Sequence, residues 1–243
     1  ASGGTFVVDT TPPGAPLFLR AAPKPAGAVR LTWSAPVDGV PAAYKAWRDG
    51  SSISNGFAPL PDGSGLFTDV PPDGSHIYSV SAVDAAGNES QQSGAVSAAA
   101  DSEPPLPPTD TAAILNTFGH IEVSWQPAGP APSAYRLYRT TINVADLSVP
   151  IQATLAAGSY FSLLVSTPPY VDTPGKNTLY YYYVTALDAA GNESLPSVPT
   201  AILWDKAPPA IILTGVQDGG IYNYTVSPVF ASTGSATAET MNA

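Results

Sequence analysis

Two pairs of carboxylates recur at the same spacing in this sequence of 243 residues. Asp84 precedes Glu89 by five positions, and Asp188 precedes Glu193 by the same five positions. Carboxylate oxygens are the ligands that Ca²⁺ prefers, but a calcium site needs about six or more oxygens. Asp side chains also cap tight turns by accepting bonds from nearby backbone N–H groups. The capping interpretation is favoured because the acidic residues are not densely spaced, and a calcium-dependent rise in melting temperature would favour the metal site.

The chain offers little else for catalysis. His76 and His120 are its two histidines, and each precedes an alternating strand pattern, where we expect a solvated side chain. No Ser-His-Asp order, Gly-x-Ser-x-Gly turn, His-Glu-x-x-His helix or glycine-rich phosphate loop is present. The absence of cysteine removes disulfides, thiolate metal sites and cysteine nucleophiles together. The sequence therefore predicts a protein that is not an enzyme and has no cofactor, with calcium as the single candidate ion.

Charge and hydropathy exclude two classes of partner. The net charge is −10 with nine Lys and Arg, so the phosphate backbone of a nucleic acid would be repelled. Anionic membrane surfaces are disfavoured for the same reason, and no apolar run approaches the roughly 20 residues that span a bilayer. The chain begins at Ala1 without a basic, apolar leader, which predicts a mature protein or a window from a longer one.

An internal repeat organises the chain. Three boundaries with the pattern Asp-x-x-Pro-Pro begin at Asp9, Asp101 and Asp205. A Pro-Pro pair lacks N–H donors and favours an extended conformation, so it marks a short, stiff junction and not the inside of a sheet. The expected segments are a strand of a preceding domain or an arm at 1–9, domains at 10–101 and 102–204, and a partial domain or strand-exchange tail at 205–243.

Apolar and polar residues alternate within each repeat. Leu31-Thr32-Trp33 matches Val123-Ser124-Trp125, and the segment 78–90 matches 182–194 almost residue for residue. A period of two is typical of half-buried strands. The offset between the repeats grows from 92 residues at the tryptophans to 104 at the later motif. The second repeat therefore contains a net insertion of 12 residues, which we place within 141–176.

The order of these motifs resembles bacterial fibronectin type III domains. Each repeat has a strand ending in Trp, then Tyr-x-x-Tyr/Trp-Arg, and then Tyr-x-Val-x-Ala-x-Asp-x-x-Gly-Asn-x-Ser. The resemblance covers most of the chain and implies an all-β fold of tandem Ig-like, seven-stranded Greek-key sandwiches in an elongated array. It also implies that Tyr78 and Tyr182 are corner tyrosines, whose hydroxyls bond to the backbone upstream. The residues expected in the two cores are Trp33, Tyr44, Tyr78, Trp125, Tyr135 and Tyr182.

Several aromatic side chains form a candidate surface for a sugar or a partner protein. If Tyr182 points inward, Tyr181 and Tyr183 point outward, and the family fold places Tyr138 beside them. Such a patch could stack on sugar rings, and Trp47 is its counterpart in the first repeat. The competing expectation, which we favour, is that apolar residues of the insertion cover the patch. The side chains expected to supply this cover are Tyr160, Phe161, Leu163 and Leu164.

Both ends of the chain resemble pieces of further domains. The segment 4–9 is similar to the last strand of a sandwich, and 210–214 and 222–226 resemble opening strands of a bacterial Ig-like domain. The favoured interpretation is a window from a longer tandem array. The alternative is strand addition between subunits, in which the segment near Phe6 completes the tail of another molecule and builds a filament.

The sequence therefore predicts a non-catalytic, extracellular or cell-surface bacterial protein that serves as a structural or adhesive spacer. A surface stalk, an adhesin shaft and a filament all fit this description. The alternative is a set of accessory modules of a secreted polysaccharide-degrading enzyme. The expected partners are neighbouring domains or subunits, and a polysaccharide or another cell-surface ligand.

Overall fold

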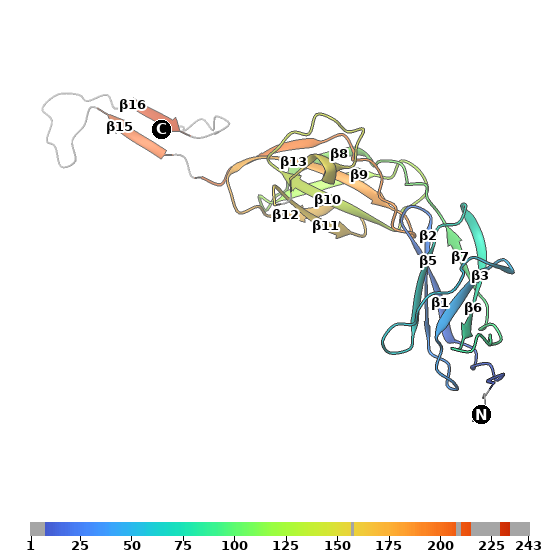
Figure 1. Cartoon of the computed structure of the whole chain (residues 1–243). Coiled ribbons are helices and arrows are strands. Elements are labelled where there is room, and N and C mark those ends of the chain that lie inside the picture. Colours follow the sequence, from blue (N-terminus) through green and yellow to red (C-terminus); the bar gives the residue numbers. More distant parts are fainter. Residues whose placement is uncertain (1–7, 157, 208–209, 215–228, 234–243) are drawn as a thin grey trace, which may run out of the picture. The chain divides into compact units, whose positions relative to one another are not determined.

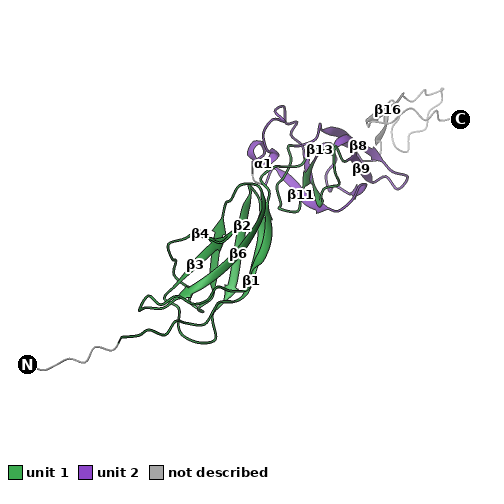
Figure 2. Cartoon of the chain, turned by 90° about the vertical axis from the view of Figure 1, so that its right-hand side faces the viewer, with its two compact units in different colours: residues 1–108, 127–136, 185–195 green, residues 109–126, 137–184, 196–243 purple. Residues whose placement is uncertain are grey.

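The computed structural model describes residues 8–156, 158–207, 210–214 and 229–233, and strands are the main regular structure of these residues (Figure 1). The chain divides into two compact units that interleave along the sequence (Figure 2). Unit 1 contains residues 1–108, 127–136 and 185–195, and unit 2 contains 109–126, 137–184 and 196–243. No helix in the described part of the chain has the length and hydrophobicity needed to cross a membrane.

Two antiparallel sheets between residues 17 and 100 form the first sandwich, which lies in unit 1. Its strand order is the one expected for a fibronectin type III sandwich, with a three-stranded sheet facing a four-stranded sheet. The three-stranded sheet has the order β1 (Leu17–Lys24), β2 (Ala28–Ser34), β5 (Gly65–Asp69). The four-stranded sheet has the order β4 (Ser51–Ser52), β3 (Ala43–Arg48), β6 (Gly74–Val83), β7 (Val96–Ala100).

Aromatic packing around Trp33 fills the first core. The indole of Trp33 meets the ring of Tyr44 edge to face, with 5.2 Å between centroids, and the ring of Phe57 at 5.7 Å. Gly65 lies directly opposite Trp33 in the β2–β5 pairing, and any side chain at Gly65 would overlap the indole. The alternation of apolar residues in β2 therefore builds the core only because the facing strand provides a glycine.

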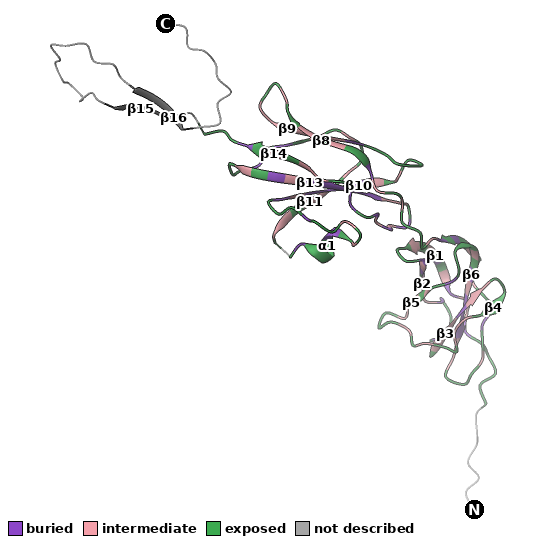
Figure 3. Ribbon diagram, turned by 90° about the horizontal axis from the view of Figure 1, so that it is seen from above, coloured by how far each residue is buried: buried purple, intermediate pink, exposed green. Residues whose placement is uncertain are grey.

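Two further antiparallel sheets form the second sandwich in the same arrangement. Its strand β13 is buried over most of its length (Figure 3), and Ile121, Val123 and Trp125 alternate as buried residues along β9. One sheet has the order β12 (Tyr170–Asp172), β9 (Ile121–Gln126), β8 (Thr109–Leu115). The other has the order β11 (Tyr160–Val165), β10 (Ala134–Thr140), β13 (Thr178–Leu187), β14 (Thr200–Trp204).

The two sandwiches differ most between the third and fourth strands. In the first, residues 49–50 form a turn that joins β3 to β4. In the second, residues 141–159 connect β10 to β11 and include the short helix α1 (Ile151–Thr154). This connection falls inside the segment where the sequence places the net insertion.

A last antiparallel pair joins β15 (Ala210–Thr214) to β16 (Val229–Thr233). The segment 222–226 and Phe6 lie outside the described residues. The prediction of strand exchange between subunits therefore stays a prediction.

His76 is held by two acceptors and is not the solvated residue expected from the sequence. Its Nδ1 lies 2.7 Å from a carboxylate oxygen of Asp49, and its Nε2 lies 2.9 Å from the carbonyl oxygen of Pro72. The bond to Asp49, followed by the bond to Pro72, raises the pKa of His76, although the nearby Arg48 opposes the shift. Because both ring nitrogens face acceptors, the charged imidazolium satisfies both.

We expect the stability of the first sandwich to decrease as pH rises through the folded-state pKa of His76. A raised pKa stabilises the folded state fully below the unfolded value of about 6.5, and this contribution is lost above the folded value. Melting temperatures of wild type and His76→Gln, measured between about pH 5 and about pH 9, should converge at the alkaline end. A difference in melting temperature between the two proteins that stays constant across this pH range would contradict the expectation.

Candidate functional site

The three Asp-x-x-Pro-Pro boundaries share one local turn. The Oδ1 atom of each aspartate accepts a hydrogen bond from the backbone N–H two residues later. The distances are 3.0 Å at Asp9, 3.1 Å at Asp101 and 2.8 Å at Asp205. This Asx turn sets the direction of the chain just before the prolines. The aspartate therefore helps to fix the backbone at the boundary. From the sequence, the stiffness of the boundary was attributed to Pro-Pro alone.

The asparagine of each Gly-Asn turn forms a hydrogen bond between the boundary and the repeat that follows it. Within unit 1, Nδ2 of Asn88 donates to the backbone carbonyl of Asp9 at 3.1 Å. In the same way, Nδ2 of Asn192 donates to the carbonyl of Asp101 at 2.9 Å. The verbatim repetition of Gly-Asn in the sequence was the signal for this role.

A side chain of the preceding repeat also forms hydrogen bonds with the boundary. In unit 1, the carboxylate of Asp73 accepts the N–H of Ser102 at 2.9 Å and its hydroxyl at 2.7 Å. In unit 2, the amide of Asn177 accepts the N–H of Lys206 at 3.2 Å and donates to Asp205 Oδ1 at 3.1 Å. The sequence analysis missed Asp73 and Asn177. Their spacing of 104 residues equals the offset between the matched segments 78–90 and 182–194, and this was the available signal.

Asn192 makes one contact that Asn88 lacks. Its Oδ1 accepts the backbone N–H of Ala26 at 2.7 Å, and a Cβ atom added at Gly191 would meet Pro25 of the same unit at 3.3 Å. The residue is only 5% exposed, and both polar atoms of its amide have partners. Within the described residues, no hydrogen bond is found at Oδ1 of Asn88.

Asn192→Ala should therefore destabilise the protein more than the matched Asn88→Ala. A net value of about 1 kcal/mol per hydrogen bond predicts about 3 kcal/mol for Asn192, whose side chain makes three bonds, and about 2 kcal/mol for Asn88, whose side chain makes two. Urea unfolding of both variants by circular dichroism would measure the difference. Equal losses would show that the bond to Ala26 contributes nothing.

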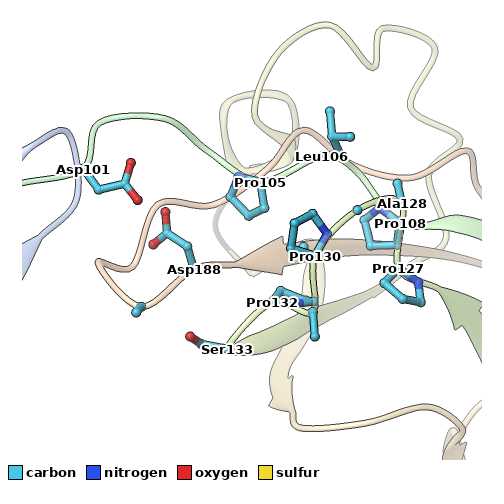
Figure 4. A pocket seen from close by; sticks show the side chains of 14 residues that line it. Asp101, Pro105, Leu106, Pro108, Pro127, Ala128, Pro130, Pro132, Ser133 and Asp188 are labelled. Atoms are coloured by element: carbon cyan, nitrogen blue, oxygen red, sulfur yellow. The ribbon is translucent and has the colours of Figure 1, made fainter. Parts of the chain in front are cut away.

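A pocket of about 380 Å³ lies beside the second boundary (Figure 4). Its lining is mainly proline and alanine, with the carboxylates of Asp101 and Asp188 on the same side of the view. Both carboxylates already accept backbone N–H bonds, from Glu103 and from Gly191 and Asn192 respectively. Ser133 is the one hydroxyl in the lining, which has no histidine, lysine or arginine. The carboxylates in the lining therefore act as turn caps, and no histidine or lysine base stands beside Ser133 in the lining.

The residues predicted for the two cores are all buried, but the corner tyrosines bond differently from the family expectation. The hydroxyl of Tyr78 donates to the carboxylate of Asp69 at 3.0 Å, not to the backbone. Tyr182 donates to Asp172 at 2.7 Å in the same way. Burial, followed by the carboxylate bond, raises the pKa of each tyrosine hydroxyl well above its usual value. The exposed fractions of the core residues are Trp33 4%, Tyr44 0%, Tyr78 0%, Trp125 1%, Tyr135 5% and Tyr182 0%.

Each of these carboxylates also pairs with an arginine. Arg48 Nη1 lies 2.7 Å from Asp69, and Arg139 Nη1 lies 2.7 and 2.8 Å from the two oxygens of Asp172. Sequence reasoning missed the two aspartates. The recurring signals were an aromatic-x-Asp triplet before each corner tyrosine and an Arg at the end of each Tyr-x-x-Tyr/Trp-Arg motif.

The predicted aromatic surface was wrong for Tyr138 and Tyr183, which are both fully buried. They lie under the insertion, in a small cluster with Val144, Ile151 and Leu155. The Tyr183 hydroxyl also accepts the N–H of Val144 at 2.6 Å. The insertion therefore covers the patch, as the competing expectation held. Of the covering side chains expected, Tyr160 packs against this cluster, whereas Phe161 and Leu164 remain 43% and 58% exposed.

The other two members of the predicted surface are partly buried. Tyr181 packs at the margin of the same cluster as Tyr183. Trp47 donates its Nε1–H to the hydroxyl of Ser81 at 3.0 Å. The four predicted residues therefore do not form one open platform for a sugar ring.

The paired carboxylates act as turn caps and ion-pair partners in the structure. Asp84 accepts the backbone and side-chain N–H groups of Asn88, and this amide holds the pKa of Asp84 below its usual value. Glu89 pairs with Lys45 at 2.7 Å, and Glu193 lies 3.3 Å from Arg136. Among the described residues, no three acidic, histidine or cysteine side chains form a group that could hold a metal ion. Calcium dependence stays a prediction for the melting experiment.

The structure therefore defines an all-β protein whose two sandwiches have the fibronectin type III fold. No family model matches the chain. Chitinase A1 of Niallia circulans is 29% identical over 209 residues, which are 81% of this chain and 26% of that enzyme. Exoglucanase B of Cellulomonas fimi is 26% identical over 210 residues, which are 82% of this chain and 17% of that enzyme. The chain thus spans about a quarter or less of the length of these relatives.

A crystal structure of the FN1–FN3 domains of chicken CNTN1 resembles the fold, with a TM-score of 0.61 and 19% identity. The match covers 82% of this chain and 70% of that one. At this identity the likeness concerns the fold alone, and the fold agrees with the expectation from the sequence.

Proposed function

We propose that this chain is a non-catalytic, extracellular spacer of fibronectin type III-like modules within a longer protein. The observation that supports this most is the repeated boundary, in which every Asp-x-x-Pro-Pro segment has an Asx turn and a hydrogen bond to a side chain of at least one adjoining repeat. Such a boundary connects modules at a set spacing, and a Gly/Ser linker would let them move freely. The carboxylates of the pocket beside the boundary cap turns, which fits a mechanical role.

A polysaccharide-degrading enzyme is the setting that the relatives favour. A chitinase and an exoglucanase both contain a segment similar to this chain that makes up only a minor part of their length. In that setting the modules would separate a catalytic domain from a substrate-anchoring one. A surface stalk or adhesin is the second setting, and the repetition of the boundary supports both.

The test uses the full-length natural protein and a variant that lacks residues 10–204. In the enzyme setting, deletion should leave hydrolysis of a soluble oligosaccharide unchanged and slow the hydrolysis of insoluble chitin or cellulose. In the stalk setting the protein has no hydrolytic activity, and deletion shortens its reach from the cell surface. Loss of hydrolysis of the soluble substrate would contradict the spacer proposal, because it would place catalytic residues within the deleted segment.

A polysaccharide ligand for the modules themselves is a separate question. The chain should pass through columns of chitin and cellulose without retention if it is only a spacer. Specific retention that a soluble oligosaccharide reverses would instead support a binding module.

A further inference from the structure

Strand β11 lies at the edge of its sheet and presents exposed apolar side chains. Its neighbour is β10, and no strand pairs with its other side within the described residues (Figure 1). Phe161 is 43% exposed and Leu164 is 58% exposed on this strand. A free edge offers backbone N–H and C=O groups to any incoming strand.

The sequence of β11 contains none of the usual features that protect an edge. It reads Tyr-Phe-Ser-Leu-Leu-Val, without charge, proline or glycine. Natural proteins usually protect edges with charges, prolines, bulges or very short strands. The equivalent edge of the first sandwich follows that rule, since β4 consists of the two exposed serines Ser51 and Ser52.

The exposed aromatic residue of this edge is held in place. The guanidinium of Arg139 lies over the ring of Phe161, 4.8 Å from its centroid. The charge of Arg139 is already matched by Asp172. The edge therefore presents a positioned aromatic ring beside a neutralised ion pair, and an incoming strand would meet no unpaired charge there.

We propose that β11 is a dimer interface, in which a second copy of this chain adds its own β11 in antiparallel orientation. Two molecules of net charge −10 repel each other, so self-association requires a contact surface that is free of acidic groups. An antiparallel pair of β11 strands meets this requirement whichever residues of the two strands face each other, because no residue of β11 is charged.

The register centred on Ser162 gives favourable cross-strand pairs. It places Phe161 opposite Leu163 of the second copy, and Tyr160 opposite Leu164 of the second copy. Aromatic and aliphatic residues that face each other across a strand pair stabilise it. The contact is two-fold symmetric, so it uses the free edge of both copies and ends at a dimer.

Sedimentation equilibrium of the chain tests this inference. Between about 1 µM and about 200 µM, the mass should rise from that of a monomer of 24.9 kDa toward twice that value. Leu164→Lys should raise the dissociation constant at least about tenfold, because it brings a charge to the unprotected edge. The matched control is Leu203→Lys on the opposite edge strand β14, where Leu203 is 49% exposed. This control should leave the dimer unchanged.

Three outcomes would overturn the proposal: a monomer at every concentration, a dimer that Leu164→Lys does not weaken, or a dimer that both lysine variants weaken equally. Circular dichroism checks that each variant is folded. If Leu164→Lys does not fold, Phe161→Ser at the same edge takes its place and has the same expected result. The proposed spacer function does not depend on this dimer, so either can fail alone.

Discussion

Asp172→Ala is expected to destabilise the second sandwich by about 3–5 kcal/mol, the usual cost of removing one partner from a buried ion pair. Asp172 is 6% exposed and accepts bonds from Arg139, from the Tyr182 hydroxyl and from the N–H of Thr173. Removing its carboxylate leaves a mostly buried guanidinium and a fully buried hydroxyl without their acceptor. Urea unfolding followed by circular dichroism and tryptophan fluorescence would measure the loss.

Asp146→Ala is the matched control for Asp172→Ala. Asp146 lies in an exposed turn and bonds only to the N–H and hydroxyl of Ser148 among the described residues. Its replacement should change stability by about 1 kcal/mol or less. Similar losses in the two variants would mean that the Arg139–Asp172–Tyr182 network does not contribute specifically. The experiment also asks whether the second sandwich unfolds separately from the first.

Gly65→Ala should destabilise the first sandwich by about 3 kcal/mol, at the upper end of the cost of over-packing. The new methyl group would lie only 2.5 Å from Nε1 of Trp33 and closer still to the indole carbons. The indole is a rigid ring fixed between Tyr44 and Phe57, so it cannot move aside without disturbing both. The melting temperature and the fluorescence of Trp33 should therefore change together.

Gly94→Ala is the control for this substitution. A Cβ atom at Gly94 meets nothing within 4 Å, and its backbone is not in the left-handed region. We expect this variant to be as stable as wild type or slightly more stable, since alanine restricts the unfolded chain. If Gly65→Ala and Gly94→Ala melt alike, the proposed fit between Gly65 and Trp33 is incorrect.

The sandwich fold could be predicted because its strands alternate strictly and the pattern occurs twice. Trp33 and Trp125 each end a period-two strand, and such residues must face a core wherever one side of a sheet is covered. The position of the insertion followed from the changing offset between matched landmarks. These signals are local and depend on residue type alone.

The bonds of the candidate site could not be predicted because they join residues far apart in the sequence. Nothing local indicates that Asn192 bonds to Ala26, or that Tyr182 selects a carboxylate in place of the backbone. Whether Tyr138 and Tyr183 were covered depended on how the connection between β10 and β11 folds over the sheet. Two interpretations remained open there until the three-dimensional arrangement was known.

β6 and β13 each lead into the same seven residues, Asp-Ala-Ala-Gly-Asn-Glu-Ser at 84–90 and 188–194, and this repetition has a consequence during synthesis. Neighbouring modules that share a segment can exchange it while they emerge from the ribosome, a typical misfolding route of repeat proteins. An Asx turn needs only residues close in sequence, so it can form at each boundary before either module is complete. The boundary aspartates would then keep nascent neighbours apart, and replacing Asp101 should increase misfolded product during translation more than it lowers the stability of the finished protein.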